Sequence, residues 1–231
     1  MAILFIDAGG NKGQSLLEFY KYIKESNDEK EELLIDAICL EPSMDEKILP
    51  ILKNEIERLQ NKKIYRSIKL LNLCLNSDFS PVSFWDNRQS GSTMVKDKSL
   101  WDPALLLDKF KSKTKLRAFA RLFKRIYIEK PKMVSSITLD VCIPHKSHYS
   151  SYYLKLDIEG GEYMIFNDKN LNLLKLNPPR KIFIEFHTLK CGKRYYETLD
   201  LFKKLKEIAP LYYWQCDKGD YKEQYKIDEN D

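Results

Sequence analysis

The chain begins with a strand–turn–helix pattern, and this pattern constrains the fold more than any other feature of the sequence. An apolar run over residues 2–6 ends in Asp7, a turn with three glycines follows over residues 8–13, and apolar residues then recur at helical spacing. Glycines let the backbone approach a bound molecule closely, and the first N–H groups of a helix point toward that molecule. The start of the chain therefore predicts the first unit of a nucleotide-binding type of α/β fold.

Strand and helix patterns continue to alternate along the chain, which predicts a doubly wound, mostly parallel α/β sheet. We expect strands over residues 2–7, 33–40, 64–75, 152–157, 181–187 and 211–216. We expect helices over residues 13–25, 44–60, 162–167 and 193–208. Pro50 should kink or split the second helix. Several of the strands are continuous apolar runs, which are typical of parallel strands covered on both faces.

One long segment, residues 79–150, departs from this alternation. It contains an expected short strand over residues 81–86, a polar loop over 90–93, and two basic helices over 103–110 and 116–126. We expect this α/β insertion to lie over the ligand-binding end of the sheet, within a single domain of residues 1–231.

Composition narrows the classes of protein to which the chain can belong. Hydrophobic residues make up 43% of 231 residues, which predicts a folded globule. No apolar run reaches the length of a membrane span, and no secretory signal is evident, so we expect no integral membrane segment. The five cysteines are scattered without metal-ligand spacing, which favours reduced thiols, no metal site and a cytoplasmic location.

Two carboxylates near strand ends are candidates for ligand binding. Asp7 could hold a cationic amine at the glycine turn, although the turn could equally be an ordinary strand-to-helix connection. Glu41, followed by Pro42, ends the second expected strand, where an acid can accept hydrogen bonds from both hydroxyls of a ribose. The alternative is a surface glutamate before a turn-forming proline. Because the turn lacks the glycine pattern of a pyrophosphate site, a ligand with a ribose and without phosphates fits best.

Two later strands each carry a pair of ionisable residues near the end. Lys155 and Asp157 share one face of their strand, as do Glu185 and His187. If the strands are neighbours in matching register, Lys155 faces Glu185 and Asp157 faces His187. Charges in apolar runs are unfavourable unless they are paired or used in function. The first pair would be a partly buried ion pair and the second an acid–base pair, with purely structural salt bridges as the alternative.

Five segments, taken in chain order, resemble the FkbM family of S-adenosylmethionine-dependent methyltransferases. D-A-G-G-N-K-G at residues 7–13 resembles the first glycine motif of the family, commonly D-x-G-A-N-x-G. The other matches are L-E-P at 40–42, S-x-T-L-D within 135–140, K-L-D-I-E-G-G-E at 155–162 and I-E-F-H at 184–187. The resemblance covers most of the chain and implies a class I, Rossmann-like sheet of seven strands.

Two departures stand out: Gly10 replaces the usual alanine, and no leading helical segment covers the substrate. The insertion, another chain or a neighbouring domain would then complete the substrate pocket.

The resemblance implies S-adenosylmethionine as cofactor. It assigns the methionine part to Asp7, Gly9, Gly10 and Gly13, the ribose to Glu41, and the adenine to Ser77 and Asp78, and it adds Asn11, Ser15 and Pro42 to the cofactor site. For Ser77 and Asp78 a simple polar turn is the alternative.

Methyl transfer to a hydroxyl needs alignment and a base. We expect Asp157 or His187 to be the base and Glu185 and Lys155 to orient them. A divalent metal on Asp157 and Glu159 is conceivable, but no ligand spacing demands one.

The resemblance favours a sugar hydroxyl in a glycan or glycoconjugate as the acceptor. Five aromatic residues could form sugar-stacking surfaces, although core packing is the commoner role: Trp85, Trp101, Tyr149, Tyr152 and Tyr153. A second hypothesis is 2′-O-methylation of RNA through the basic residues 109–117, but no RNA-binding module is evident. A third is a non-catalytic role, with residues 116–125 docking to an anionic membrane or a partner. We also expect either a homo-oligomer or a partner domain.

Overall fold

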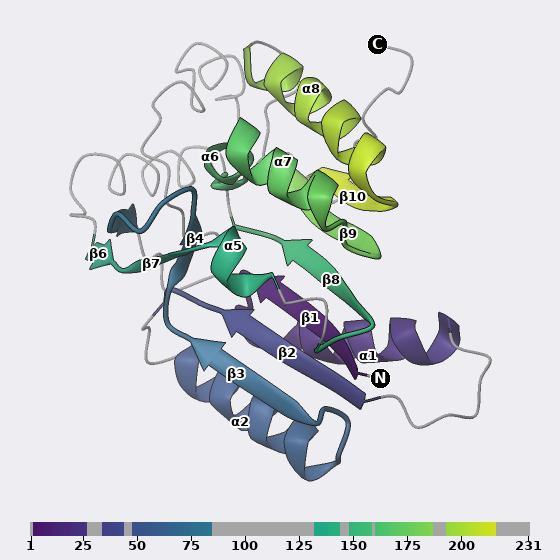
Figure 1. Ribbon diagram of the computed structural model, residues 1–231. Helices are drawn as coiled ribbons and strands as arrows, with labels where there is room; N and C mark the ends of the chain where they lie inside the picture. The colour runs from purple at the N-terminus through teal and green to yellow at the C-terminus, as the bar shows by residue number, and fades with distance from the viewer. Residues whose placement is uncertain are drawn as a thin grey trace, which may run out of the picture.

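A central sheet of six parallel strands forms the core of the computed structural model, which describes residues 2–26, 34–43, 48–84, 132–143, 148–158, 160–186 and 193–215. The strand order is β10-β9-β8-β1-β2-β3 (Figure 1). The strands are β1 (Ala2–Ala8), β2 (Leu34–Leu40), β3 (Ser67–Leu71), β8 (Ser151–Leu156), β9 (Lys181–Phe186) and β10 (Leu211–Gln215). The chain reverses its direction of winding between β1 and β8, which confirms a doubly wound, Rossmann-like sheet.

Helices cover both faces of this sheet because side chains alternate along each strand. On one face, Ile3 and Phe5 pack with α1 (Gln14–Ser26) and α2 (Leu49–Asn61). On the other face, Leu4 and Ile6 belong to the cluster of α5 (Leu139–Cys142), α6 (Glu162–Ile165), α7 (Asp168–Leu176) and α8 (Lys193–Ile208). Both faces of β1 are therefore buried, as its continuous apolar run predicts.

Among the described residues the central sheet has six strands, one fewer than the seven that the resemblance implies. β9 and β10 pair directly with each other at the edge of this sheet. The expected third strand also ends early. β3 stops at Leu71, and the following residues form β4 (Cys74–Asn76), which leaves the central sheet and pairs with β7 (Ser136–Thr138).

Two helix predictions also change. Pro50 does not kink the described helix α2, because it lies in the first turn, where no intrahelical partner is needed for the missing N–H. The expected helix over residues 162–167 ends at Ile165, and α7 follows at once. The side chain of Asn167 caps α7 by accepting a hydrogen bond from the N–H of Asn170 at 2.9 Å.

The described parts of the insertion contribute strands to two small two-stranded sheets, β4-β7 and β5-β6. β5 (Val82–Phe84) confirms the short strand expected over residues 81–86 and pairs antiparallel with β6 (Lys132–Val134). Cys74, Val82 and Phe84 form a small core there. Trp85, Trp101, the polar loop and both basic helices lie outside the described residues. No helix in the described ranges is long and apolar enough to cross a membrane.

Candidate functional site

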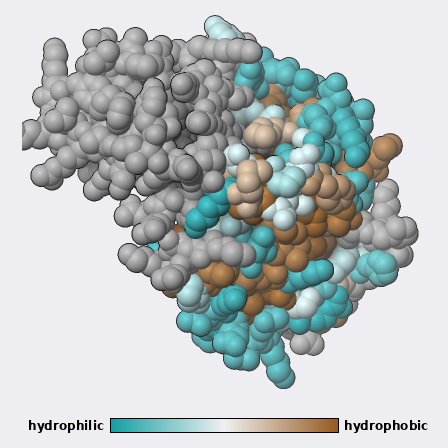
Figure 2. All heavy atoms as spheres, turned by 90° about the vertical axis from the view of Figure 1, so that its left-hand side faces the viewer, coloured by the Kyte–Doolittle hydropathy of each residue, from teal (hydrophilic) through white to brown (hydrophobic). Residues whose placement is uncertain are grey.

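The carboxyl ends of β1, β2 and β8 meet at one edge of the sheet and bring three predicted site segments together (Figure 1). Asp7 on β1 lies opposite Lys155 on β8, and Glu41 directly follows β2. Figure 2 looks onto this side of the molecule and shows hydrophobic residues gathered beside hydrophilic ones. In open α/β sheets, ligands bind at this carboxyl edge.

Lys155 connects the charged residues of this edge. Its Nζ lies 3.1 Å from Oδ1 of Asp7 and 3.6 Å from Oδ2 of Asp157, and it donates a hydrogen bond of 2.8 Å to the carbonyl of Gly9. Burial alone would lower the pKa of Lys155, but the carboxylates of Asp7 and Asp157 outweigh it and hold the pKa above its ordinary value. Lys155 is therefore charged at neutral pH and lies between the two carboxylates.

Asp7 lies beneath the glycine turn. Its side chain is fully buried, and its Oδ2 accepts a hydrogen bond of 2.5 Å from the hydroxyl of Ser15 on α1. With Lys155 on its other oxygen, Asp7 anchors the turn and the start of α1 to the sheet. Asp157, with a side chain 30% exposed, is the carboxylate of this ion-pair group that reaches the surface.

The glycine turn is pressed against the ends of β2 and β8. The N–H groups of Gly9 and Gly10 both donate to the carbonyl of Leu40, at 3.0 and 3.1 Å. A Cβ atom on Gly9 would overlap the carbonyl oxygen of Asp157, and one on Gly10 would overlap Sγ of Cys39. Gly9 also has a φ of +89°, which favours glycine. The replacement of the usual alanine by Gly10 therefore has a steric reason in this chain.

Glu41 ties the turn to β2. Its Oε2 accepts a hydrogen bond of 2.6 Å from the N–H of Asn11, and its Oε1 accepts one of 2.8 Å from the N–H of Ser43. Burial raises the pKa of Glu41 above its ordinary value. Each carboxylate oxygen keeps a second lone pair, which can accept a hydroxyl of a ligand.

Gly9, Gly10, Asn11 and Glu41 form a cradle whose side-chain acceptors, the oxygens of Glu41 and Asn11, suit a ligand with hydroxyl or amine donors. Cβ atoms at both glycines are excluded by the protein itself, and this lets the turn lie close against β2 and β8. The side-chain oxygen of Asn11 is buried and has no hydrogen-bond partner among the described residues. Buried polar atoms are usually partnered, so this acceptor can take a hydrogen bond from a ligand donor. Gly13 and Pro42 flank the cradle at the start of α1 and after Glu41.

Ser77 and Asp78 form a tight turn after β4. The carboxylate of Asp78 accepts a hydrogen bond of 2.8 Å from the N–H of Ser80 and one of 3.3 Å from the side chain of Asn76. The hydroxyl of Ser136 lies 3.0 Å from the carbonyl oxygen of Asp78. The carboxylate of Asp78 therefore stabilises the turn in which it lies. Ser136 was not singled out from the sequence, although it lies in the S-x-T-L-D segment and holds this turn against β7.

The predicted facing of Lys155 and Glu185 is wrong. Lys155 on β8 pairs in register with Phe183 on β9, two residues before Glu185. Lys155 instead meets Asp7 on its other neighbour, β1. A long connection separates β8 from β9, and the sequence pattern carries no information on the offset between them. His187 lies outside the described residues, so its pairing with Asp157 stays a prediction.

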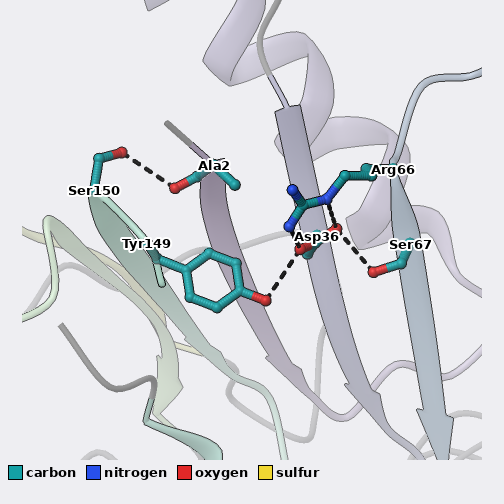
Figure 3. Close-up of polar contacts among 6 residues, drawn as sticks. All are labelled: Ala2, Asp36, Arg66, Ser67, Tyr149 and Ser150. Atoms are coloured by element: carbon teal, nitrogen blue, oxygen red, sulfur yellow. Dashed lines mark hydrogen bonds and ion pairs between the residues drawn. The ribbon is translucent and has the colours of Figure 1, made fainter. Parts of the chain in front are cut away.

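Three tyrosines predicted as possible sugar-stacking residues lie elsewhere. Tyr152 and Tyr153 are each 3% exposed and pack in the core, as the alternative held. The hydroxyl of Tyr149 donates a hydrogen bond of 3.0 Å to Asp36 at the amino end of the sheet (Figure 3). The stacking prediction is therefore wrong for these tyrosines.

Among the described residues, no group of three His, Cys, Asp or Glu side chains is arranged to hold a metal ion.

Comparison with known protein families agrees with this geometry. The family model of the methyltransferase FkbM domain matches residues 7–209, from Asp7 on β1 to the residue after α8. No curated protein and no solved structure matches the chain.

Proposed function

The chain belongs to the FkbM family of methyltransferases, and we propose that it transfers a methyl group from S-adenosylmethionine to a hydroxyl oxygen. One observation carries the proposal. The closely packed turn at Gly9 and Gly10 lies beside Glu41 and Asp157 at the carboxyl edge of the sheet.

The cradle matches the cofactor in charge and in hydrogen bonding. S-adenosylmethionine supplies an electrophilic methyl group attached to a positively charged sulfur. Glu41 would accept the ribose hydroxyls, and the side-chain oxygen of Asn11 would accept a donor of the methionine part. Three carboxylates (Asp7, Glu41 and Asp157) and the single ammonium of Lys155 leave a net charge of −2 when all are ionised. A negative site favours a cationic ligand.

Asp157 is the base that the described geometry supports best. Its carboxylate is partly exposed, follows the end of β8, and lies 3.6 Å from the ammonium of Lys155. It would take the proton from the acceptor hydroxyl as that oxygen attacks the methyl carbon, a role that contributes on the order of 10²–10⁴ in rate. Lys155 positions this carboxylate. His187 is the second candidate for the base, with Glu185 as its orienting residue.

We propose a sugar hydroxyl of a glycan or glycoconjugate as the acceptor and a cytoplasmic location for the protein. The acceptor rests on the family resemblance. The location is supported by the free cysteines Cys39, Cys74 and Cys142, which fit a reducing compartment. We also propose that the insertion, a second copy of the chain or a neighbouring domain completes the acceptor pocket.

Calorimetry followed by mass spectrometry tests the proposal. The wild-type chain is titrated with S-adenosylmethionine, then incubated with it and with oligosaccharides, sugar nucleotides and a short RNA. We expect saturable binding and a carbohydrate product heavier by one methyl group in place of a proton. If the RNA is methylated instead, and the activity falls steeply as the salt concentration rises, the acceptor is RNA and not a sugar. No binding of S-adenosylmethionine would contradict the proposed function.

A further inference from the structure

Gly10 and Cys39 meet at the base of the cradle. A Cβ atom added to Gly10 would overlap Sγ of Cys39 and lie 3.8 Å from both Oδ2 of Asp7 and the carbonyl oxygen of Leu40. Sγ of Cys39 is thus the nearest atom beneath Gly10. The two residues are 29 positions apart in the chain and on different elements, so the tertiary structure alone brings them together.

Cys39 is held firmly in this place. Its side chain is fully buried, and its backbone pairs with Asp7 on β1 and with Leu70 on β3. Burial, together with the negative charges of Asp7 and Glu41, raises the pKa of the thiol well above its ordinary value. The residue is therefore a neutral, unreactive thiol that acts through its volume.

The turn above Cys39 controls two ligand-facing groups. The N–H groups of Gly9 and Gly10 fasten the turn to the carbonyl of Leu40, and the N–H of Asn11 fastens it to Glu41. A turn lifted away from Cys39 would lengthen these bonds together. It would also displace the side chain of Asn11 and draw the carboxylate of Glu41 away from its present place.

We propose that Cys39 is a positioning residue for the cofactor: its sulfur supports Gly10 and sets the height of the glycine turn over the sheet. This inference rests on the proposed function, because the turn is taken to contact S-adenosylmethionine. It implies that residue 10 must be glycine while residue 39 is cysteine, and that a smaller residue 39 makes room for alanine at position 10.

Gly9 offers a matched contrast at the neighbouring position. A Cβ atom there meets the backbone carbonyl of Asp157, and the φ of +89° disfavours any other residue. No substitution of Cys39 can relieve either problem. Cys142 offers a second control, because it is also a free and buried cysteine, but it lies on α5.

A double-mutant cycle tests the inference. We measure the dissociation constant of S-adenosylmethionine by calorimetry and the thermal midpoint of the ligand-free protein for wild type, Gly10→Ala, Cys39→Ala and the double variant. Gly10→Ala should weaken binding about tenfold, within the range of coupling between residues in contact. Cys39→Ala alone should weaken it about two- to threefold, and the double variant should bind as Cys39→Ala does. The thermal midpoints of the four ligand-free proteins should follow the same pattern. Gly10→Ala should have the lowest midpoint, and the double variant should match Cys39→Ala.

The controls decide between positioning and a general loss of stability. Cys142→Ala should not rescue Gly10→Ala, and Cys39→Ala should not rescue Gly9→Ala. A double variant that binds as weakly as Gly10→Ala, or equal rescue by Cys142→Ala, would overturn the inference. If the wild type does not bind S-adenosylmethionine, the proposed function fails instead. The thermal midpoints of the ligand-free proteins then decide alone. If Cys39→Ala does not restore the midpoint of Gly10→Ala, the inference that Cys39 supports the turn is overturned.

Discussion

The two ends of the central sheet carry similar ion pairs with different consequences. At the carboxyl end, the buried Asp7 is paired with Lys155 and accepts a bond from the hydroxyl of Ser15. At the amino end, the buried Asp36 is paired with Arg66 and accepts bonds from the hydroxyls of Ser67, at 2.8 Å, and Tyr149, at 3.0 Å (Figure 3).

Charge balance distinguishes the two ends. At the amino end, one guanidinium serves one carboxylate, and the cluster ties β2 to β3 and to the segment that precedes β8. At the carboxyl end, the single ammonium of Lys155 is shared by Asp7 and Asp157, and Glu41 lies beside them. An ion pair by itself therefore says little about function. An excess of one charge at the carboxyl edge of the sheet indicates a candidate ligand site.

The largest effect should come from Asp157→Asn. Removing the base should slow methyl transfer by roughly 10²–10⁴-fold and leave cofactor affinity nearly unchanged. Single-turnover transfer to the acceptor found by mass spectrometry measures the rate, and calorimetry measures the affinity. Asp36→Asn, at the other end of the sheet, is the control and should keep the rate of transfer. Equal losses of rate and affinity in Asp157→Asn would argue against a base.

Lys155→Met should destabilise the fold more than Arg66→Met does. The first change leaves Asp7 buried without a cation, a loss of about 3–5 kcal/mol in the free energy of unfolding. Arg66 is 47% exposed, and its removal leaves two hydroxyl donors on Asp36, so a clearly smaller loss is expected. Urea denaturation compares the two. The double variant Asp7→Asn/Lys155→Met should recover part of the first loss, and no recovery would contradict the account of an uncompensated charge.

Asp36→Asn should lower the free energy of unfolding by about 1.5–3 kcal/mol at neutral pH, because hydrogen bonds to a charged group are lost. Burial would raise the pKa of Asp36, but the bonds from Arg66, Ser67 and Tyr149 outweigh it and lower the pKa below 3.8. The stabilisation is thus present above that value and is lost as pH falls through the lowered pKa. Urea denaturation of both proteins across acid pH should show the difference between them shrinking only in strong acid.

Glu41→Ala should weaken the binding of S-adenosylmethionine by roughly 1–3 kcal/mol through lost charged hydrogen bonds. The pKa of Glu41 is raised above 4.5 by burial, so protonation on acidification begins at a higher pH than for an exposed glutamate. Wild-type affinity should therefore fall as pH falls through the raised pKa, whereas Glu41→Gln should be flatter. Calorimetry at several pH values measures both, and parallel pH profiles would contradict the ribose role.

Much of the fold was predictable because its signals are local. Hydrophobic runs and glycine positions located all six strands of the central sheet and the helices that match α1, α2 and α8. Asp7, Glu41 and Asp157 could be expected at one edge, since the carboxyl ends of parallel strands lie together. Pro50 shows the limit of a local reading, because its effect depends on whether it lies in the interior or in the first turn of the helix.

The sequence by itself determined which residues form the strands, which face each side chain takes, and which carboxylates end at the ligand edge. Only the tertiary structure decided that Lys155 meets Asp7 in place of Glu185, that β4 leaves the sheet for β7, and that the sulfur of Cys39 lies under Gly10. The physical reason is the range of the interactions. Periodicity is set by the backbone within a few residues, whereas register and close approach are set by packing between segments far apart in the chain.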